Sequence, residues 1–410
     1  MLNGGGINPD GLSLDLQFAA DKTLTARRGP TPVFTRGSTG TFVGSNGLIQ
    51  TAAVNGPRFD HDPVTLACKG LLIEEGRTNY LIHSQDFQNW LASSNVVSRN
   101  KELTIADPSG GFTANRIVGN SVASVYRDPV NGVPVGNRSN SIYARAVTGG
   151  VNRIEIAGTG IFVRVNLETG SLISSSGVVA GSVVIQPIGS IGPDGYTWYR
   201  ISAVPTSTTL ASMYLSPNPT VFTGDRDLFL LWGAQLEVGS FPTSYIPTTT
   251  GSVVRSADVC SITTAGWSNA GNDTMVAEYF VRNFLSGSVV LEGGPLVSWM
   301  SVSFTGVNQQ RNIYRHGGTS NRVDAVSGTD SVSLTSINKI ALTSGEQIAL
   351  NGSLSQTLFG DPPQSDISTI LSIGRRSDFG GANYLNGHIA AIRYFRKRLP
   401  DAKLQSLTAP

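Results

Sequence analysis

A two-residue rhythm of apolar and polar side chains is the feature of this sequence that most constrains its fold. Across residues 161–167, Ile, Val, Val and Leu occupy every second position, and Phe, Arg and Asn lie between them. Residues 142–146 follow the same rhythm, and Gly149-Gly150 and Thr169-Gly170 mark turns after the two runs. Runs of this kind predict antiparallel strands with one face against a core and the other in water.

The composition suits short strands joined by tight turns. The 410 residues include 47 Gly and 20 Pro, which supply positive φ and fixed φ at turn corners. Near the C-terminus, Pro400 and Asp401 stand before Leu404 and Leu407 as in the first turn of a short helix. We therefore predict an all-β protein of tandem antiparallel β-sandwich or jelly-roll domains with one short C-terminal helix.

The length predicts two or three domains. Residues 1–83 are rich in turn signals, residues 84–253 carry the alternation, and residues 254–410 form a second strand-rich segment. A Pro/Thr-rich stretch at 246–251 looks like a connector. The predicted domains are therefore 1–83, 84–253 and 254–410.

Charge and cysteine content narrow the classes of partner. The net charge is +2, and Arg396-Lys397-Arg398 is too short a basic run to grip a nucleic acid duplex. Cys68 and Cys260 lack metal-ligand spacing, so we expect two free, packed thiols. No signal peptide is evident, and the most apolar run, 228–232, is far shorter than the roughly 20 residues that span a bilayer. We expect a soluble protein made in a cytoplasm, without nucleic acid or membrane insertion.

Four motifs in residues 14–84 carry a resemblance to a known group of proteins. They are Leu14-Asp15-Leu16-Gln17-Phe18, Phe34-Thr35-Arg36-Gly37-Ser38-Thr39-Gly40-Thr41, Pro57-Arg58-Phe59-Asp60-His61 and Gly70-Leu71-Leu72-Ile73-Glu74-Glu75-Gly76-Arg77-Thr78-Asn79. Together they resemble an N-terminal module of phage and prophage structural proteins. The resemblance implies that this segment docks the chain on a virion.

The two later segments also resemble phage modules. Ser84, Phe87 and Trp90, with residues 232–237 and 243–248, resemble the boundaries of a jelly roll akin to carbohydrate-binding modules. Residues 348–352, 371–375 and 385–389, followed by the segment around Tyr394, resemble a concanavalin A-like, laminin-G-type sandwich. These modules occur in tail fibres, baseplates and head decorations of tailed phages.

Catalytic candidates are few. Asp60-His61-Asp62 pairs carboxylates with an imidazole, but neighbours on an extended chain point in different directions, and Pro57 and Pro63 favour a rigid capped turn. Glu74 and Glu75 face opposite ways if they lie on a strand and so do not form a glycosidase pair; a salt bridge from one of them to Arg77 is the favoured interpretation. We predict no enzyme activity.

Metal ligands are also sparse. Asp225 and Asp227 lie two residues apart and could bind Ca²⁺ with backbone carbonyls, although turn stabilisation is the favoured role. His83, His316 and His388 stand singly and do not predict a zinc site. No cofactor is expected beyond this calcium candidate.

Sugar binding needs exposed aromatic rings beside amide and carboxylate groups. Two clusters have that chemistry, with core packing as the competing role for their aromatics: Asn312, Tyr314, Arg315 and His316; and Asp378, Asn383 and Tyr384. Trp198, Tyr199 and Trp232 lie inside apolar strand patterns and are predicted core residues.

The resemblance implies a non-enzymatic structural protein on the surface of a tailed-bacteriophage virion. Its partners would be other virion proteins, further copies of itself (a trimer, by analogy) and host-surface polysaccharide bound by lectin-like domains. Two alternatives stay open: an architectural decoration protein without a ligand, and a polysaccharide depolymerase.

Overall fold

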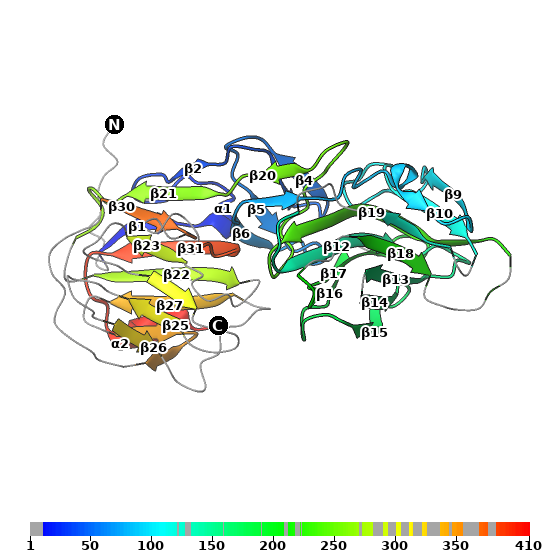
Figure 1. Ribbon diagram of the computed structural model, residues 1–410. Coiled ribbons are helices and arrows are strands. Elements are labelled where there is room, and N and C mark those ends of the chain that lie inside the picture. Colours follow the sequence, from blue (N-terminus) through cyan, green and yellow to red (C-terminus); the bar gives the residue numbers. More distant parts are fainter. Residues whose placement is uncertain are drawn as a thin grey trace.

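The computed structural model shows two β-rich lobes lying side by side (Figure 1). It describes residues 11–120, 123–127, 133–158, 160–189, 191–208, 212–217, 222, 224–269, 273–281, 290–293, 301–304, 311–314, 322–325, 337–343, 347–355, 369–375 and 383–410. Among the described residues, strands account for 48% and helices for 5%, and the sheets are antiparallel. The predicted all-β fold class is therefore confirmed.

Both ends of the chain build one lobe, the terminal lobe, from residues 11–79 and 253–410. Its larger sheet has the order β29-β28-β27-β22-β31-β6-β5, with β1 also paired to β31, and its smaller sheet has the order β2-β21-β30-β23. The larger sheet contains β1 (Leu12–Leu16), β5 (Phe59–His61), β6 (Cys68–Ile73), β22 (Thr274–Val281), β27 (Asn338–Thr343), β28 (Ile348–Leu350), β29 (Ser353–Ser355) and β31 (Gly387–Phe395). The smaller sheet contains β2 (Val33–Thr35), β21 (Val259–Thr263), β23 (Leu291–Gly293) and β30 (Ile370–Ile373). The lobe also contains β24 (Ser301–Phe304), β25 (Arg311–Tyr314) and β26 (Arg322–Ala325), which pair with one another, and the helices α1 (Phe18–Asp21) and α2 (Asp401–Thr408).

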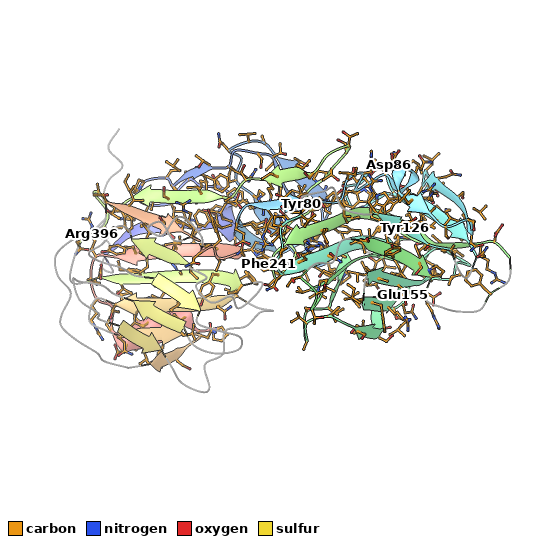
Figure 2. The ribbon with its side chains drawn as sticks, viewed as in Figure 1. Tyr80, Asp86, Tyr126, Glu155, Phe241 and Arg396 are labelled. Atoms are coloured by element: carbon orange, nitrogen blue, oxygen red, sulfur yellow. The ribbon has the colours of Figure 1, made fainter. Side chains whose placement is uncertain are left out.

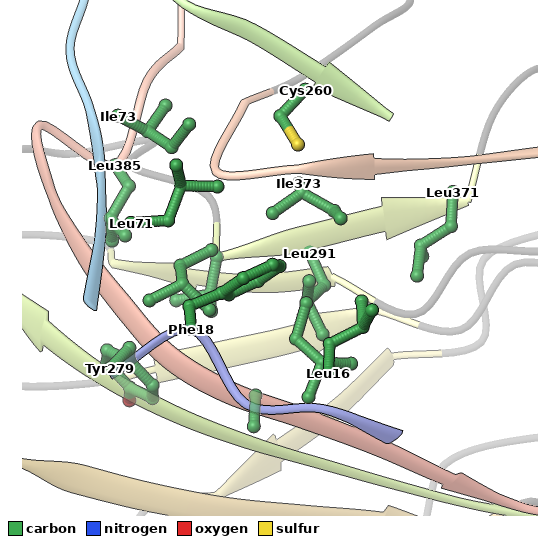
Figure 3. Packing of buried hydrophobic residues seen from close by; sticks show 14 of the residues in the cluster. Leu16, Phe18, Leu71, Ile73, Cys260, Tyr279, Leu291, Leu371, Ile373 and Leu385 are labelled. Carbon is green, nitrogen blue, oxygen red and sulfur yellow. The ribbon is translucent and has the colours of Figure 1, made fainter. Parts of the chain in front are cut away.

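Apolar side chains from the two sheets form the core of the terminal lobe (Figure 3). Leu16, Phe18 and Leu71 from the start of the chain pack with Cys260 and Ile373 from the smaller sheet. Each of these five side chains is buried. This core therefore closes only when segments from both ends of the sequence come together.

The N-terminal segment predicted as a virion-docking module supplies strands to the same sheets as the C-terminal segment. Residues 71–73 of β6 pair with 387–389 of β31, and β1 pairs with the far end of the same strand. Strand β2 pairs with β21 in the smaller sheet. Residues 11–79 and 253–410 thus share one hydrophobic core.

The central lobe, residues 80–252, is a second sandwich. Its sheets have the orders β16-β17-β12-β19-β10-β9 and β15-β14-β13-β18-β11-β8, which we call the inner-lobe sheet and the outer-lobe sheet. The inner-lobe sheet contains β9 (Val96–Lys101), β10 (Asn115–Gly119), β12 (Arg138–Arg145), β16 (Val184–Ile188), β17 (Trp198–Ala203) and β19 (Arg226–Val238). The outer-lobe sheet contains β8 (Leu91–Ala92), β11 (Val125–Arg127), β13 (Arg153–Gly158), β14 (Ile161–Asn166), β15 (Ser171–Ser176) and β18 (Met213–Pro217); the 3-10 turn η1 spans Phe87–Asn89.

The alternation in the sequence matches burial along the outer-lobe sheet. Every second residue of β14, beginning at Ile161, is buried, and the residues between them are half-buried. Strand β12 differs, because all eight of its residues are buried. Tyr143 on its second face packs with Trp232, Tyr245 and Ile49 under a cover from outside the sheet. The expectation of one wet face was therefore wrong for β12.

Part of this cover over β12 comes from the terminal lobe. The hairpin of β3 (Gly40–Val43) and β4 (Ile49–Ala52) reaches the central lobe, where the Ile49 amide donates to the Pro108 carbonyl. The chain enters and leaves the central lobe through a ribbon in which β7 (Arg77–Asn79) pairs antiparallel with β20 (Val253–Arg255). The central lobe is thus inserted between two paired strands.

A buried ionic network lies at the junction of the two lobes. The guanidinium of Arg58 is fully buried and contacts Glu74 Oε2 at 2.9 Å and Asp258 Oδ2 at 2.5 Å. It also donates to the hydroxyl of Ser244, at 2.8 Å, on the central lobe. Burial works against the charge of Arg58, but Asp258 and Glu74 outweigh that effect and raise its pKa. The network therefore bonds the lobes directly.

Three smaller predictions are confirmed. The C-terminal helix is α2, with Pro400 as its N-cap residue and Leu404 buried. Both cysteines are free, with Cys260 buried and Cys68 half-buried. Trp198 and Trp232 are core residues, and Tyr199 packs partly buried against the core of the central lobe. The described helices include none long and apolar enough to cross a membrane.

Candidate functional site

The outer surface of the outer-lobe sheet gathers solvent-facing aromatic and charged side chains. We call it the aromatic face and define it by Tyr126, Glu155, Phe162, Arg164 and Tyr214. Figure 2 labels Tyr126 and Glu155 on this part of the central lobe. Burial alternates along β13, β14 and β18, so these side chains point away from the sandwich core.

Two tyrosines form a stacked pair on this face. Strands β11 and β18 place Tyr126 directly opposite Tyr214. The ring centroids are 4.9 Å apart and the ring planes differ by 17°. Tyr214 is 37% exposed. On the other side of Tyr214, the residue across from it is Ala157.

Charged groups lie in the next row across the sheet. Glu155 on β13 faces Arg164 on β14, and their side chains form an ion pair with Arg164 Nε 2.5 Å from Glu155 Oε2. The Arg164 guanidinium also stacks over the Phe162 ring, 4.2 Å from its centroid. Ser216 lies opposite Glu155 and Ser174 opposite Arg164. The row therefore runs hydroxyl, carboxylate, guanidinium, hydroxyl.

This arrangement combines two kinds of contact on one flat surface. Aromatic rings present apolar faces that pack on the C–H faces of a sugar ring. Carboxylate, guanidinium and hydroxyl groups accept from and donate to sugar hydroxyls. The pairing of strands fixes the spacing of the two rows, so the face is organised before any ligand arrives.

The sugar-binding residues predicted from the sequence lie in the terminal lobe. Tyr384 is 8% exposed and belongs to the core of that lobe, so its ring is not an open stacking surface. Asn383 is half-buried beside it. Asn312 and Tyr314 lie on β25, and nothing is described of their side chains. Arg315, His316 and Asp378 lie outside the described residues.

The calcium candidate does not form a carboxylate cluster. Asp227 lies on β19 and pairs with Arg116, whose Nη1 is 2.8 Å from its Oδ2. Asp225 precedes the strand and is exposed. Within the part of the chain that the structure describes, no group of three or more His, Cys, Asp or Glu could hold a metal ion.

The residues of Asp60-His61-Asp62 take separate structural roles. Asp60 contacts His388 Nε2 at 2.7 Å and accepts from the Val43 amide. Asp62 accepts from the amides of Val64 and Thr65, as expected for a turn cap. Burial disfavours its ionised form, but these hydrogen bonds and nearby Lys69 lower the pKa of Asp62 to about 2.

The two adjacent glutamates are also held in place. Glu74 is buried in the junction network with Arg58, whereas Glu75 pairs with Arg77 as predicted. His83 is half-buried in a turn with φ of 54°, and His316 lies outside the described residues. Asp62 therefore caps a turn, and Glu74 and Glu75 lie in ion pairs. His61 Nδ1 lies 3.2 Å from the carbonyl oxygen of Val43.

Part of the aromatic face was visible in the sequence. The alternation placed Phe162, Arg164 and Glu155 on the wet side of their strands. No local pattern linked Tyr126 to Tyr214, because the two residues come from strands far apart in the chain. Their contact depends on the register of β11 with β18.

Comparisons with known proteins identify no family. No family model matches the chain, and no curated protein matches it. Among the solved structures that match, one is a "putative carbohydrate binding protein from Bacteroides ovatus ATCC 8483". It is 11% identical with a TM-score of 0.28, and the alignment covers 70% of this chain and 80% of that chain. A likeness at this level carries no argument about function.

Proposed function

We propose that this chain is a non-enzymatic carbohydrate-binding protein and that the aromatic face is its binding surface. The observation that carries the proposal is the stacked, solvent-facing pair of Tyr126 and Tyr214 beside the Glu155–Arg164 ion pair. A rigid ring pair offers stacking area at little cost in side-chain entropy. The neighbouring polar row would read the hydroxyl pattern of the sugar.

Binding without catalysis is supported by the positions of the acidic groups. A glycosidase needs two carboxyl groups on either side of the bond that it cleaves. Glu155 is held in an ion pair with Arg164, and Glu74 is buried at the lobe junction. Asp60 is held by His388. These contacts favour a binding surface over a reactive centre.

Display on a tailed-phage virion forms the second part of the proposal. It rests on the resemblance of residues 14–84 and of the later segments to phage structural modules. In this setting the chain is made in the host cytoplasm, docks on other virion proteins and assembles with further copies of itself. Repeated copies would let weak sugar sites act together.

A glycan array with the full chain tests the sugar-binding part. We expect binding to one class of bacterial surface polysaccharide, weakened about thirtyfold when Tyr126→Ala and Tyr214→Ala are combined, at about 1 kcal/mol per ring. Phe112→Ala is the matched control, because Phe112 is an exposed aromatic (51%) of the same lobe outside the aromatic face.

Three results separate this proposal from its alternatives. Unchanged affinity in the double tyrosine variant would show that the sugar does not bind at the aromatic face. Absence of binding by the wild-type chain would favour an architectural decoration protein. Release of reducing ends from a bound polysaccharide would indicate a depolymerase.

A further inference from the structure

Two polar side chains point into the interior of the central lobe from one end of β12. Ile142 and Ala144 of this strand belong to the core between the two sheets. Arg138 and Asn140 have the same parity along the strand, so they share that inward face, about 6.5 Å apart at their Cα atoms. A charged group and an amide therefore stand where the rest of the strand presents apolar side chains.

Both side chains are buried, and both leave hydrogen-bonding atoms unsatisfied. Arg138 is 4% exposed and Asn140 is 3% exposed. Within the described part of the chain, neither polar atom of the Asn140 amide has a hydrogen-bond partner, and Arg138 Nε has none. Arg138 Nη2 donates to the Pro134 carbonyl at 3.3 Å, and no carboxylate of the described residues pairs with this guanidinium.

Burying Arg138 and Asn140 in this way lowers the stability of the folded chain, which indicates a site for a bound anion. A buried charge without a counter-ion and a buried amide without hydrogen bonds each oppose folding. Burial lowers the pKa of Arg138, and the nearby phenol of Tyr80 only partly opposes that effect. Tyr80, which is labelled in Figure 2, packs partly buried against the same core, and its amide donates to the carbonyl of Leu236, which lies opposite Asn140. An anion between these three side chains would neutralise the charge and satisfy the amide.

We propose that Arg138, Asn140 and Tyr80 form a binding site for a hydroxy-carboxylate, either an acidic sugar or a free hydroxy acid. The carboxylate would accept from Arg138 Nε and from the Asn140 amide nitrogen. The adjacent hydroxyl would donate to the Asn140 amide oxygen, since that atom only accepts. This site is separate from the aromatic face, which lies on the outer surface of the opposite sheet, and it does not depend on the proposed function.

Calorimetry and thermal unfolding of the full chain test the site with three probes. Glucuronate carries the carboxylate on a sugar, lactate carries it on a small hydroxy acid, and glucose carries hydroxyl groups alone. We expect glucuronate or lactate to bind and to raise the Tm, and glucose to do neither. The better of the two acids then identifies the source of the ligand.

Two variants localise the site. Arg138→Met and Asn140→Leu should each weaken binding of the acid at least about tenfold. Asn140→Leu should fold with an unchanged or higher Tm without ligand, because an apolar group of similar size replaces an unsatisfied amide. Arg153→Met, which removes an exposed positive charge of the same lobe, should bind like the wild type.

Three outcomes would overturn the site: neither acid binds, glucose binds as well as glucuronate, or both site variants keep wild-type affinity. The combined Tyr126→Ala and Tyr214→Ala variant should keep its affinity for the acid. Loss of polysaccharide binding in that variant is therefore distinguishable from failure of this site.

Discussion

At the scale of single residues, several charged side chains are buried together at the junction of the two lobes. Arg36, Arg58 and Arg255 converge with Glu74 and Asp258 at the lobe junction. Arg58 touches both carboxylates, so its removal would leave two buried anions without their closest cation. Breaking one partner of a buried ion pair costs far more than breaking an exposed pair.

Arg58→Met should therefore lower the free energy of unfolding by about 3–5 kcal/mol, measured by urea denaturation. Arg27→Met is the control, because Arg27 pairs with Asp21 at 2.6 Å but its side chain is 52% exposed. That variant should change stability far less than Arg58→Met does, because water and salt screen an exposed ion pair. Equal effects in the two variants would contradict a structural role for the network.

The sequence could predict what single residues do only where the contact is local. The cap of Asp62 on residues 64 and 65 and the pairing of Glu75 with Arg77 both lie within three residues. The contacts of Asp60 with His388 and of Tyr126 with Tyr214 depend on which strands become neighbours. No short motif specifies which distant strands pair or in what register, so these contacts could not be predicted from the sequence.

At the scale of elements, strand pairing in the terminal lobe depends on close backbone approach. Gly70 on β6 has a φ of 104°, and a Cβ atom there would lie 2.2 Å from the carbonyl oxygen of Ile389 on β31. Glycine is needed for both reasons, the positive φ and the missing side chain. The contact joins a strand from the start of the chain to one from its end.

Gly70→Ala should destabilise the protein by about 3 kcal/mol or more, because β6 must move away from β31. Gly160→Ala is the matched control, since Gly160 also has a positive φ (76°) but no atom of the described residues lies within 4 Å of where its methyl group would stand. It should cost only about 1 kcal/mol. Thermal unfolding followed by circular dichroism compares the two, and similar costs would contradict the close approach.

Element type was predictable where one face of a strand is wet. The rhythm along β13 and β14 survives in the structure, because only their inward faces are covered. Burial does not alternate along β12, because β4 and neighbouring loops bury its second face. Alternation of apolar and polar residues in the sequence cannot predict this burial, because it depends on segments that pack on the sheet from elsewhere in the chain.

At the scale of the whole molecule, the central lobe interrupts the terminal lobe. Composition changes near residues 83 and 253, close to where β7 and β20 form the ribbon. The sequence does not reveal that the segments on either side of this insertion share a core, because their contacts span most of the chain. A fragment of residues 254–410 would lack β1 and β6, the partners of β31.

A chain in which Asn-Gly replaces residues 80–252 should therefore fold as the terminal lobe alone. Asn79 and Val253 face each other in the ribbon, and a two-residue Asn-Gly loop closes such an antiparallel pair. We expect cooperative thermal unfolding and little binding of a hydrophobic dye. The 254–410 fragment should bind the dye strongly, and cooperative folding of that fragment by itself would refute the shared core.

The ribbon of β7 and β20 also has a mechanical consequence. The central lobe is connected to the terminal lobe by two strands. A force that pulls on the central lobe is therefore shared between the two connections, whereas a single linker would carry all of it. Two attachment points also resist twisting of one lobe against the other. If the central lobe binds sugars as proposed, these non-covalent contacts would break before the two covalent connections between the lobes.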